Sequence, residues 1–173
     1  MEWGVYLLAC LSGPGVRTYI GATPDLRARV RTHNRGRGAK LTRGGGWTPV
    51  IHVTGFSDKR SALSFESGWR RAGRRRRSDR LRVWEQVVGE RIRYRREPIH
   101  DRLVDLLWFT RTARRWDAGW RCGRDLYPLW LSEALGLRLS LQSPQAWAIY
   151  RDWPWPPGIG VLADEEGSPP ALD

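Results

Sequence analysis

The stretch from Arg17 to Asn34 constrains the fold most, because its pattern changes from that of a strand to that of a helix within a few residues. Val16 to Ile20 is short, β-branched and aromatic, which is typical of a strand, and Gly21 is expected to end it. Thr23-Pro24-Asp25 combines a helix-capping residue with one that suits the first helical turn. We therefore expect a strand followed directly by a helix from Leu26.

The predicted helix carries two different side-chain faces. Leu26 and Val30 lie four residues apart and form an apolar stripe. Arg29 and His33 are also four apart, so they project from nearly the same side of the helix. An arginine and a histidine one turn apart, close to a strand that carries Tyr19, would make a compact polar cluster able to hold a phosphate.

Another strand is predicted upstream, over Trp3 to Leu11, where the chain is a run of bulky apolar residues. Ser12-Gly13-Pro14-Gly15 is a turn signal, so the two strands should form a hairpin. This hairpin would place Tyr6 and Tyr19 on adjacent strands, with both hydroxyls near the end of the following helix. Taken alone, two such tyrosines are more typical of ordinary strand aromatics.

A third strand and a second helix follow. Trp47 to Phe56 alternates β-branched residues, and Ser57 or Asp58 begins a helical pattern that ends near Ala72. Glu66 lies next to the apolar stripe of this helix, where a carboxylate is costly unless it meets a cation or a metal ion. An isolated glutamate on a helix is otherwise most often a solvated surface residue.

The charge of the chain points to a polyanionic partner. The formal net charge is +12, and only two of the 30 basic residues, Lys40 and Lys59, are lysines. An arginine excess of this kind either provides bidentate contacts to phosphates or reflects a GC-rich genome. No long apolar or amphipathic segment suggests a membrane helix, so nucleic acid is the expected partner and a membrane is not.

Two basic segments follow the two predicted helices. The glycine-rich loop from Asn34 to Gly46 would let its backbone approach a phosphate closely, and the run from Arg70 to Arg80 leaves the helix that carries Glu66. The alternatives are a flexible connector for the loop, and a solvated or nuclear-localisation segment for the run. The residues expected to contact DNA are Arg27, Arg31, Arg35, Arg37, Lys40, Arg43, Arg70, Arg71, Arg74 and Arg75.

Five separated elements agree in order and spacing with one family. They are Gly4-Val5-Tyr6, Thr18-Tyr19-Ile20-Gly21, Arg29, His33, and Glu66 within Ala62 to Trp69. Together they resemble the GIY-YIG nucleases, and from about Trp3 to Arg71 the chain is most similar to the catalytic subunit of the Slx-type structure-selective endonucleases. The resemblance implies an α/β fold with a small mixed or antiparallel three-stranded sheet flanked by helices, followed here by a mainly helical C-terminal extension.

The resemblance also implies an activity, the metal-dependent hydrolysis of phosphodiesters in branched DNA (flaps, forks and Holliday junctions) during DNA repair and recombination. Glu66 would hold one divalent ion, Mg²⁺ or Mn²⁺, and Arg29 would neutralise the charge that develops on the phosphate. Tyr6 is the candidate general base or proton relay, and Tyr19 would orient water and phosphate. His33 would orient Tyr6 or contact the phosphate, with general acid or base catalysis as the alternative.

After residue 80 the composition changes. We expect a nuclease domain over 1–80, a helical, tryptophan-rich extension over 81–162 and a flexible acidic tail over 163–173. Helical spacing is predicted over Arg80 to Val88, Asp101 to Arg115 and Leu126 to Leu137, with a looped segment over Trp153 to Gly158. The tryptophans of the extension are Trp108, Trp116, Trp120, Trp130, Trp147, Trp153 and Trp155.

One departure from the Slx type concerns zinc and the partner subunit. Slx-type proteins normally carry a C-terminal zinc finger that binds a scaffold subunit, and Cys122 with His100 cannot form one, so no zinc is expected. A scaffold protein could dock on the tryptophan-rich extension instead. Aromatic residues at this density more often fill a core or an interface than stack on bases.

The cysteine content favours a reduced compartment. Cys10 and Cys122 are too few for a disulfide framework, and the apolar start of the chain lacks the features of a secretory signal. We therefore expect an intracellular protein, in the nucleus of a eukaryote or the cytoplasm of a bacterium. Three other functions stay open: a stand-alone nuclease on simple DNA, an RNA-processing nuclease, and a non-catalytic nucleic-acid-binding module.

Overall fold

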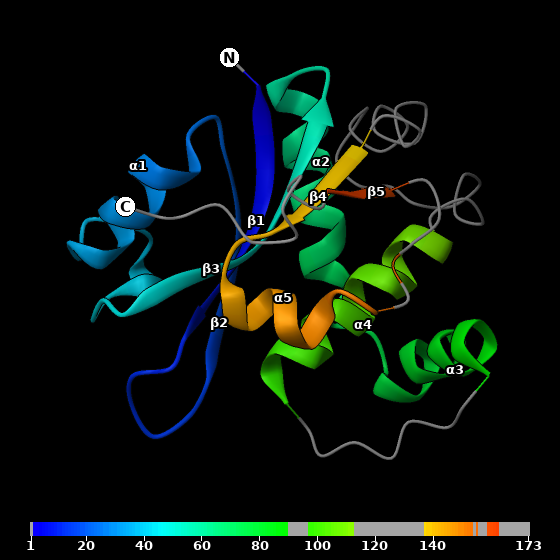
Figure 1. Cartoon of the computed structure of the whole chain (residues 1–173). Helices are drawn as coiled ribbons and strands as arrows, with labels where there is room; N and C mark the ends of the chain where they lie inside the picture. Colours follow the sequence, from blue (N-terminus) through cyan, green and yellow to red (C-terminus); the bar gives the residue numbers. More distant parts are fainter. Residues whose placement is uncertain (1, 90–96, 113–136, 154, 156–158, 163–173) are drawn as a thin grey trace.

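A mixed sheet in the strand order β2-β1-β3-β4-β5 forms the centre of the molecule (Figure 1). The computed structural model describes residues 2–89, 97–112, 137–153, 155 and 159–162. The elements are β1 (Trp3–Cys10), β2 (Arg17–Thr23), α1 (Leu26–Asn34), the 3₁₀ turn η1 (Lys40–Thr42), β3 (Trp47–Phe56), α2 (Lys59–Ala72), α3 (Arg77–Val88), α4 (Pro98–Thr112), β4 (Leu137–Leu141), α5 (Pro144–Tyr150) and β5 (Ile159–Leu162).

The strand pairing places both site tyrosines on the same side of the sheet. Strand β1 pairs antiparallel with β2 and with β3, β4 pairs antiparallel with β3, and β5 runs parallel to β4. In the hairpin register Tyr6 lies opposite Gly21 and Leu8 lies opposite Tyr19. Since side chains alternate along a strand, Tyr6 and Tyr19 project from the same face as diagonal neighbours.

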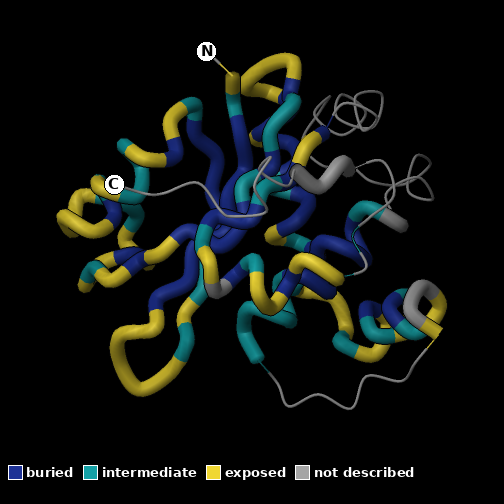
Figure 2. The backbone as a smooth tube through the Cα atoms, in the orientation of Figure 1, coloured by how far each residue is buried: buried dark blue, intermediate teal, exposed yellow. Residues whose placement is uncertain are grey.

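Strand β1 is buried on both of its faces. Val5 and Leu7 belong to the large core cluster under α2 and α4, whereas Tyr6, Leu8 and Cys10 belong to a smaller cluster under α1. Figure 1 shows α1 on one side of the sheet and α2 with α4 on the other, and Figure 2 shows the central strands buried. An apolar run without polar alternation is what two covered faces require.

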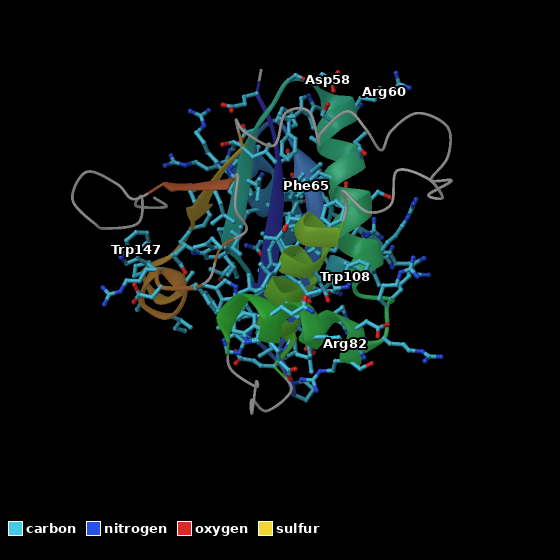
Figure 3. All side chains as sticks on the ribbon, turned by 90° about the vertical axis from the view of Figure 1, so that its right-hand side faces the viewer. Asp58, Arg60, Phe65, Arg82, Trp108 and Trp147 are labelled. Carbon is cyan, nitrogen blue, oxygen red and sulfur yellow. The ribbon has the colours of Figure 1, made fainter. Side chains whose placement is uncertain are left out.

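Helix α2 packs on the sheet through the predicted apolar stripe. Phe65 and Trp69 are fully buried, each contributing about 1.5–3 kcal/mol by area, and Figure 3 shows Phe65 between α2 and the sheet. The Trp69 indole N–H donates to the carbonyl of Arg102 in α4 at 2.8 Å. Gly68 lets the two helices approach closely, because a side chain there would collide with the ring of Phe109. These contacts fix α2, and with it Glu66.

A buried ion pair joins α3 to α4. The Arg80 guanidinium pairs with the carboxylate of Asp105, which also accepts from Arg102 at 3.3 Å. Trp84 of α3 packs with Val104 of α4 in a separate cluster. The arginine run after α2 is thus partly helical, because α3 begins at Arg77 rather than near Arg80.

The tryptophans of the extension that the structure describes are packed on the protein. Trp108 is buried, and Trp147, Trp153 and Trp155 are partly buried against the large core. This agrees with the core or interface interpretation for these four residues. Trp116, Trp120, Trp130 and Cys122 lie outside the described residues, as does the predicted acidic tail over 163–173.

Three expectations on elements need correction. The sheet has five strands rather than three, because β4 and β5 of the region expected to be mainly helical pair onto β3. Leu137 begins β4 instead of ending a helix, and the rest of that predicted helix lies outside the described residues. Gly21 lies inside β2, which continues to Thr23, so this glycine does not end the strand. The α/β class, the hairpin, α1 and α2 are confirmed.

Candidate active site

The hydroxyl of Tyr6 lies at the centre of the candidate site. It is 3.0 Å from His33 Nε2, and Arg29 Nε donates to it at 3.3 Å. Both partners come from one side of α1, as their four-residue spacing predicts. Gly21 on β2 makes room for this arrangement, because a Cβ there would collide with the Tyr6 hydroxyl. The glycine of the second motif is therefore a requirement of packing around the tyrosine.

His33 is held from its other ring nitrogen by the loop that follows α1. Its side chain is fully buried, and Nδ1 lies 2.6 Å from Thr42 Oγ1. The Thr42 hydroxyl donates to the carbonyl of Ala39 at 2.7 Å. Gly38 passes directly over this contact, since a Cβ there would collide with His33 Nδ1. The imidazole is thus fixed between strand β1 and the loop.

Tyr19 forms one wall of the site. Its ring centroid is 5.1 Å from that of His33 and 6.3 Å from that of Tyr6. The ring of Trp47 lies edge-on to Tyr19 at 6.4 Å. Tyr19 is only half-buried, in contrast to Tyr6. Part of Tyr19 therefore stays exposed to solvent, whereas Tyr6 does not.

Glu66 reaches the site from the opposite helical layer. It lies on α2, its side chain is 13% exposed, and it pairs with Arg70 at 3.1 Å one turn along the helix. The charge of Glu66 acts on Tyr6 and that of Arg29 acts on Glu66, so the three groups lie within electrostatic range of one another. Tyr6, Arg29, His33 and Tyr19 are therefore linked by hydrogen bonds and ring contacts, and Glu66 is linked to Tyr6 and Arg29 through their charges.

Burial and charge shift the titration of three of these groups. Burial raises the pKa of Tyr6 to about 12, against the opposing effect of the hydrogen bond and charge of Arg29. Burial and the Arg29 charge lower the pKa of His33, so the imidazole is neutral at neutral pH. Burial raises the pKa of Glu66, and Arg70 and Arg29 oppose that rise. The tyrosine is accordingly a neutral phenol, and its neighbour is a neutral imidazole.

Glu66 offers a carboxylate, which is the kind of ligand that a divalent cation binds. Mg²⁺ commonly binds to one or two carboxylates and completes its shell with water and substrate phosphates. Glu66 is a mostly buried carboxylate of this site, and its side chain pairs with Arg70, whose own side chain is exposed. Across the described residues, no three His, Cys, Asp or Glu side chains gather closely enough to enclose a metal ion by themselves.

The arginines expected to contact DNA lie on two segments beside this site. Arg70 adjoins Glu66 directly, and the others follow it in the chain or lie on α1 and the loop after it. All of the predicted DNA-contacting residues are exposed except Arg71, which is half-buried. In the described part of the chain no helix has the length and apolar character needed to span a bilayer.

Sequence reasoning missed three residues around the site. Thr42 orients His33, and Asn34 exchanges two hydrogen bonds with the backbone of Trp47, at 2.8 and 3.0 Å. His52 lies opposite Tyr6 in the sheet, under the gap left by Gly4, and burial lowers its pKa to about 4. Gly38 lies against His33 and Gly4 lies against His52, so these glycines were a sequence signal for close packing. A glycine does not, however, indicate which residue packs against it.

The fold and the geometry of the site define the class of protein. The sequence model of the GIY-YIG catalytic domain family matches residues 2–79 of this chain. These residues include every side chain of the site described above. The chain belongs to the GIY-YIG family, carries the catalytic domain of that family, and is an endonuclease.

Particular relatives refine this assignment. The chain is 31% identical to the uncharacterised protein L300 of Acanthamoeba polyphaga mimivirus over 159 residues, which cover 89% of this chain and 93% of that protein. It is 45% identical over 73 residues to the human structure-specific endonuclease subunit SLX1, covering 39% of this chain and 26% of that subunit. It is 40% identical over 70 residues to a UPF0213 protein of Streptococcus pneumoniae, covering 40% of this chain and 68% of that protein. The likeness to SLX1 thus concerns the catalytic domain only.

Proposed function

We propose that this protein is a metal-dependent, structure-selective endonuclease that hydrolyses phosphodiesters in branched DNA such as flaps, forks and Holliday junctions, in DNA repair and recombination. The observation that carries the proposal is the Tyr6 hydroxyl, placed between Arg29 and a neutral His33 and within electrostatic range of Glu66. A domain shared with structure-specific SLX1 subunits supports the substrate class. The exposed arginines on both sides of the site support a polyanionic substrate.

Tyr6 relays a proton in this proposal instead of acting as a free phenolate. A pKa raised to about 12 makes the isolated phenolate costly at neutral pH. As water attacks the phosphorus, it gives a proton to the Tyr6 oxygen, and the original Tyr6 proton passes to His33 Nε2. A new bond forms between phosphorus and the water oxygen, the bond to the leaving 3′ oxygen breaks, and that oxygen takes its proton from solvent.

Arg29 has two successive roles in this scheme. Tyr6 is fully buried before substrate binds, and Arg29 donates to its oxygen. When Arg29 turns from the tyrosine to the phosphate, it neutralises the developing charge and frees a lone pair of Tyr6 for the attacking water. Tyr19, half-buried beside His33, orients that water and the phosphate.

Glu66 would hold one divalent cation, Mg²⁺ or Mn²⁺, against the scissile phosphate. When bound, this ion would supply charge neutralisation at the phosphate oxygens. Arg70 leaves the carboxylate in that state and is then available to a backbone phosphate of the DNA, since it is exposed and held to Glu66 by one surface ion pair.

The partners and the place of action are part of the proposal. DNA is the substrate, and a scaffold protein could dock on the tryptophan-rich extension. An intracellular location is expected, with the nucleus or the cytoplasm set by the host. The division into a nuclease domain over 1–80, an extension over 81–162 and a tail over 163–173 also remains a proposal, although β4 and β5 of the extension join the nuclease sheet.

The substrate panel that tests the proposal contains labelled 5′-flap, splayed-arm, Holliday-junction and plain duplex DNA, with matched RNA forks, each assayed with and without Mg²⁺ or Mn²⁺. Metal-dependent cutting near the branch of DNA substrates supports it. Faster cutting of RNA forks would show an RNA-processing nuclease, and equal cutting of plain duplex would show a stand-alone nuclease. Binding of every substrate without cleavage would show a non-catalytic module.

A further inference from the structure

Thr42 is a buried hydroxyl residue that the proposed chemistry has not used. Its side chain is fully buried and lies between the imidazole of His33 and the backbone of Ala39. The loop positions it from three sides: it sits in the 3₁₀ turn η1, its carbonyl accepts from the Trp47 indole at 2.8 Å, and Gly38 leaves room for the contact with His33. These contacts hold the Thr42 side chain so that its Oγ1 faces His33 Nδ1.

The direction of each hydrogen bond follows from the acceptors. A carbonyl oxygen can only accept, so the single hydroxyl proton of Thr42 goes to Ala39 O. Toward His33 the Thr42 oxygen must therefore accept, which requires a proton on Nδ1. In a neutral imidazole the other nitrogen then carries a lone pair, and Nε2 is the atom that lies 3.0 Å from the Tyr6 hydroxyl.

We propose that Thr42 is a positioning residue that holds neutral His33 in the tautomer with its proton on Nδ1, so that Nε2 is free to accept the proton of Tyr6. The catalytic consequence rests on the proposed function, whereas the tautomer itself does not. Without Thr42, the loop no longer favours a proton on one ring nitrogen of His33 over the other. In the opposite tautomer, Nε2 would carry a proton and the Tyr6 hydroxyl could no longer donate to it.

The tautomer can be measured directly on the full chain. Protein labelled with ¹⁵N in its three histidines is examined by long-range ¹H–¹⁵N correlation at neutral pH, with His33 assigned by loss of its signal in His33→Gln. We expect a protonated Nδ1 in the wild type and in Thr42→Ser, and a shift toward protonated Nε2 in Thr42→Val. Thr32→Val is the matched control, because that hydroxyl donates to Ala28 O within α1 and does not reach the site.

Cleavage kinetics give the second readout. Thr42→Val should lower kcat by between about tenfold and a hundredfold, the range found when a metal-bound histidine loses the partner that orients it. KM should change little, and Thr42→Ser should restore most of the rate. A protonated Nε2 in the wild type, or an unchanged tautomer in folded Thr42→Val, would overturn the proposal. If the wild type cuts no substrate, the proposed function fails while the tautomer measurement still decides the role of Thr42.

Discussion

At the scale of single residues, the site depends on a neutral phenol beside a neutral imidazole. Two side chains of α1, Arg29 and His33, contact the Tyr6 hydroxyl, and burial disfavours loss of its proton until a base can take it. Because burial raises the pKa of Tyr6, this environment disfavours a mechanism that needs a preformed phenolate. The proton relay to His33 uses it, because the donor and the acceptor are both uncharged before the reaction.

Removal of the Tyr6 hydroxyl should separate chemistry from binding. Tyr6→Phe keeps the buried ring but leaves no relay, so kcat is expected to fall by about 10²–10⁴, the usual contribution of a positioned acid–base group. DNA affinity should be almost unchanged, since the arginines provide it. Single-turnover cleavage and filter binding measure the two effects. Tyr150→Phe is the control, because Tyr150 is a buried tyrosine of the large core cluster. Equal activity of Tyr6→Phe and wild type would contradict the relay.

The pH dependence follows from the same residues. A protonated His33 cannot accept from Tyr6, and its pKa lies below the ordinary 6.5 because of burial and then Arg29. The cleavage rate should therefore be level above about pH 6.5 and fall as the pH drops through the lowered pKa. Protonation of Glu66, whose pKa is raised by burial, adds to the loss on the acid side. A rate that increased on acidification, in single-turnover profiles, would contradict this assignment.

At the scale of elements, the position of Glu66 depends on how α2 and α4 pack. Gly68 against Phe109 and the Trp69 indole on Arg102 join the two helices, and the pair of Arg80 with Asp105 joins α4 to α3. The buried carboxylate of Asp105 has a pKa raised by burial in spite of the two arginines beside it. Because removing two charges from water offsets much of their mutual attraction, a buried pair of this kind is weak evidence for a net gain in stability, although losing one partner is costly.

Breaking the Arg80–Asp105 pair should be strongly destabilising. In Asp105→Ala the Arg80 guanidinium, which is almost fully buried, is left without its anion, and we expect a loss of about 3–5 kcal/mol in the free energy of unfolding. Urea denaturation followed by tryptophan fluorescence measures it. Asp152→Ala, which removes an exposed partner of Arg151, should cost less than about 1 kcal/mol. Similar costs for both variants would show that the buried pair is not structural.

Much of the site was predictable at the level of elements. The four-residue spacing of Arg29 and His33 is a local property, so periodicity was enough to place both on one side of α1. The turn signal predicted the hairpin that carries Tyr6 and Tyr19, but only the family resemblance singled out these tyrosines and Glu66. Thr42 was not predictable as a partner of His33, because a glycine-rich loop has no periodicity and its fold depends on Trp47 and Asn34. Gly21 was wrongly predicted to end the strand. It is a glycine because the Tyr6 side chain on the neighbouring strand leaves no room for a Cβ, and the sequence alone does not distinguish such a glycine from one that ends a strand.

At the scale of the whole molecule, the sequence predicted the layers but not the full width of the sheet. Three strands and two helices have clear patterns, whereas β4 is only five residues long and β5 only four. Short strands like these are set by pairing with a distant partner, here β3, and carry little signal of their own. The formal charge of +12, in contrast, is readable from sequence and needs no structure.

The exposed arginines should give DNA binding a steep dependence on salt. Arg74→Ala, in the run that follows α2, is expected to weaken binding to all DNA sequences alike and to reduce the slope of log K against log salt by about one. Arg60→Ala is the matched control, because that exposed arginine lies at the other end of α2 (Figure 3). Fluorescence anisotropy at several salt concentrations measures both. Equal slopes for the two variants would mean that the run after α2 is not part of the DNA surface.

The central claim is that Tyr6, Arg29, His33 and Glu66 form a nuclease site, and Glu66→Gln tests it most directly. The measurement is single-turnover cleavage of a labelled 5′-flap with and without Mg²⁺, beside DNA affinity and the control Glu85→Gln on α3. We predict metal-dependent cutting near the branch by wild type and Glu85→Gln. Cleavage by Glu66→Gln should be slower by two orders of magnitude or more, since a metal ion contributes several kcal/mol to the transition state, and its affinity should be retained. Full activity of Glu66→Gln would contradict the account.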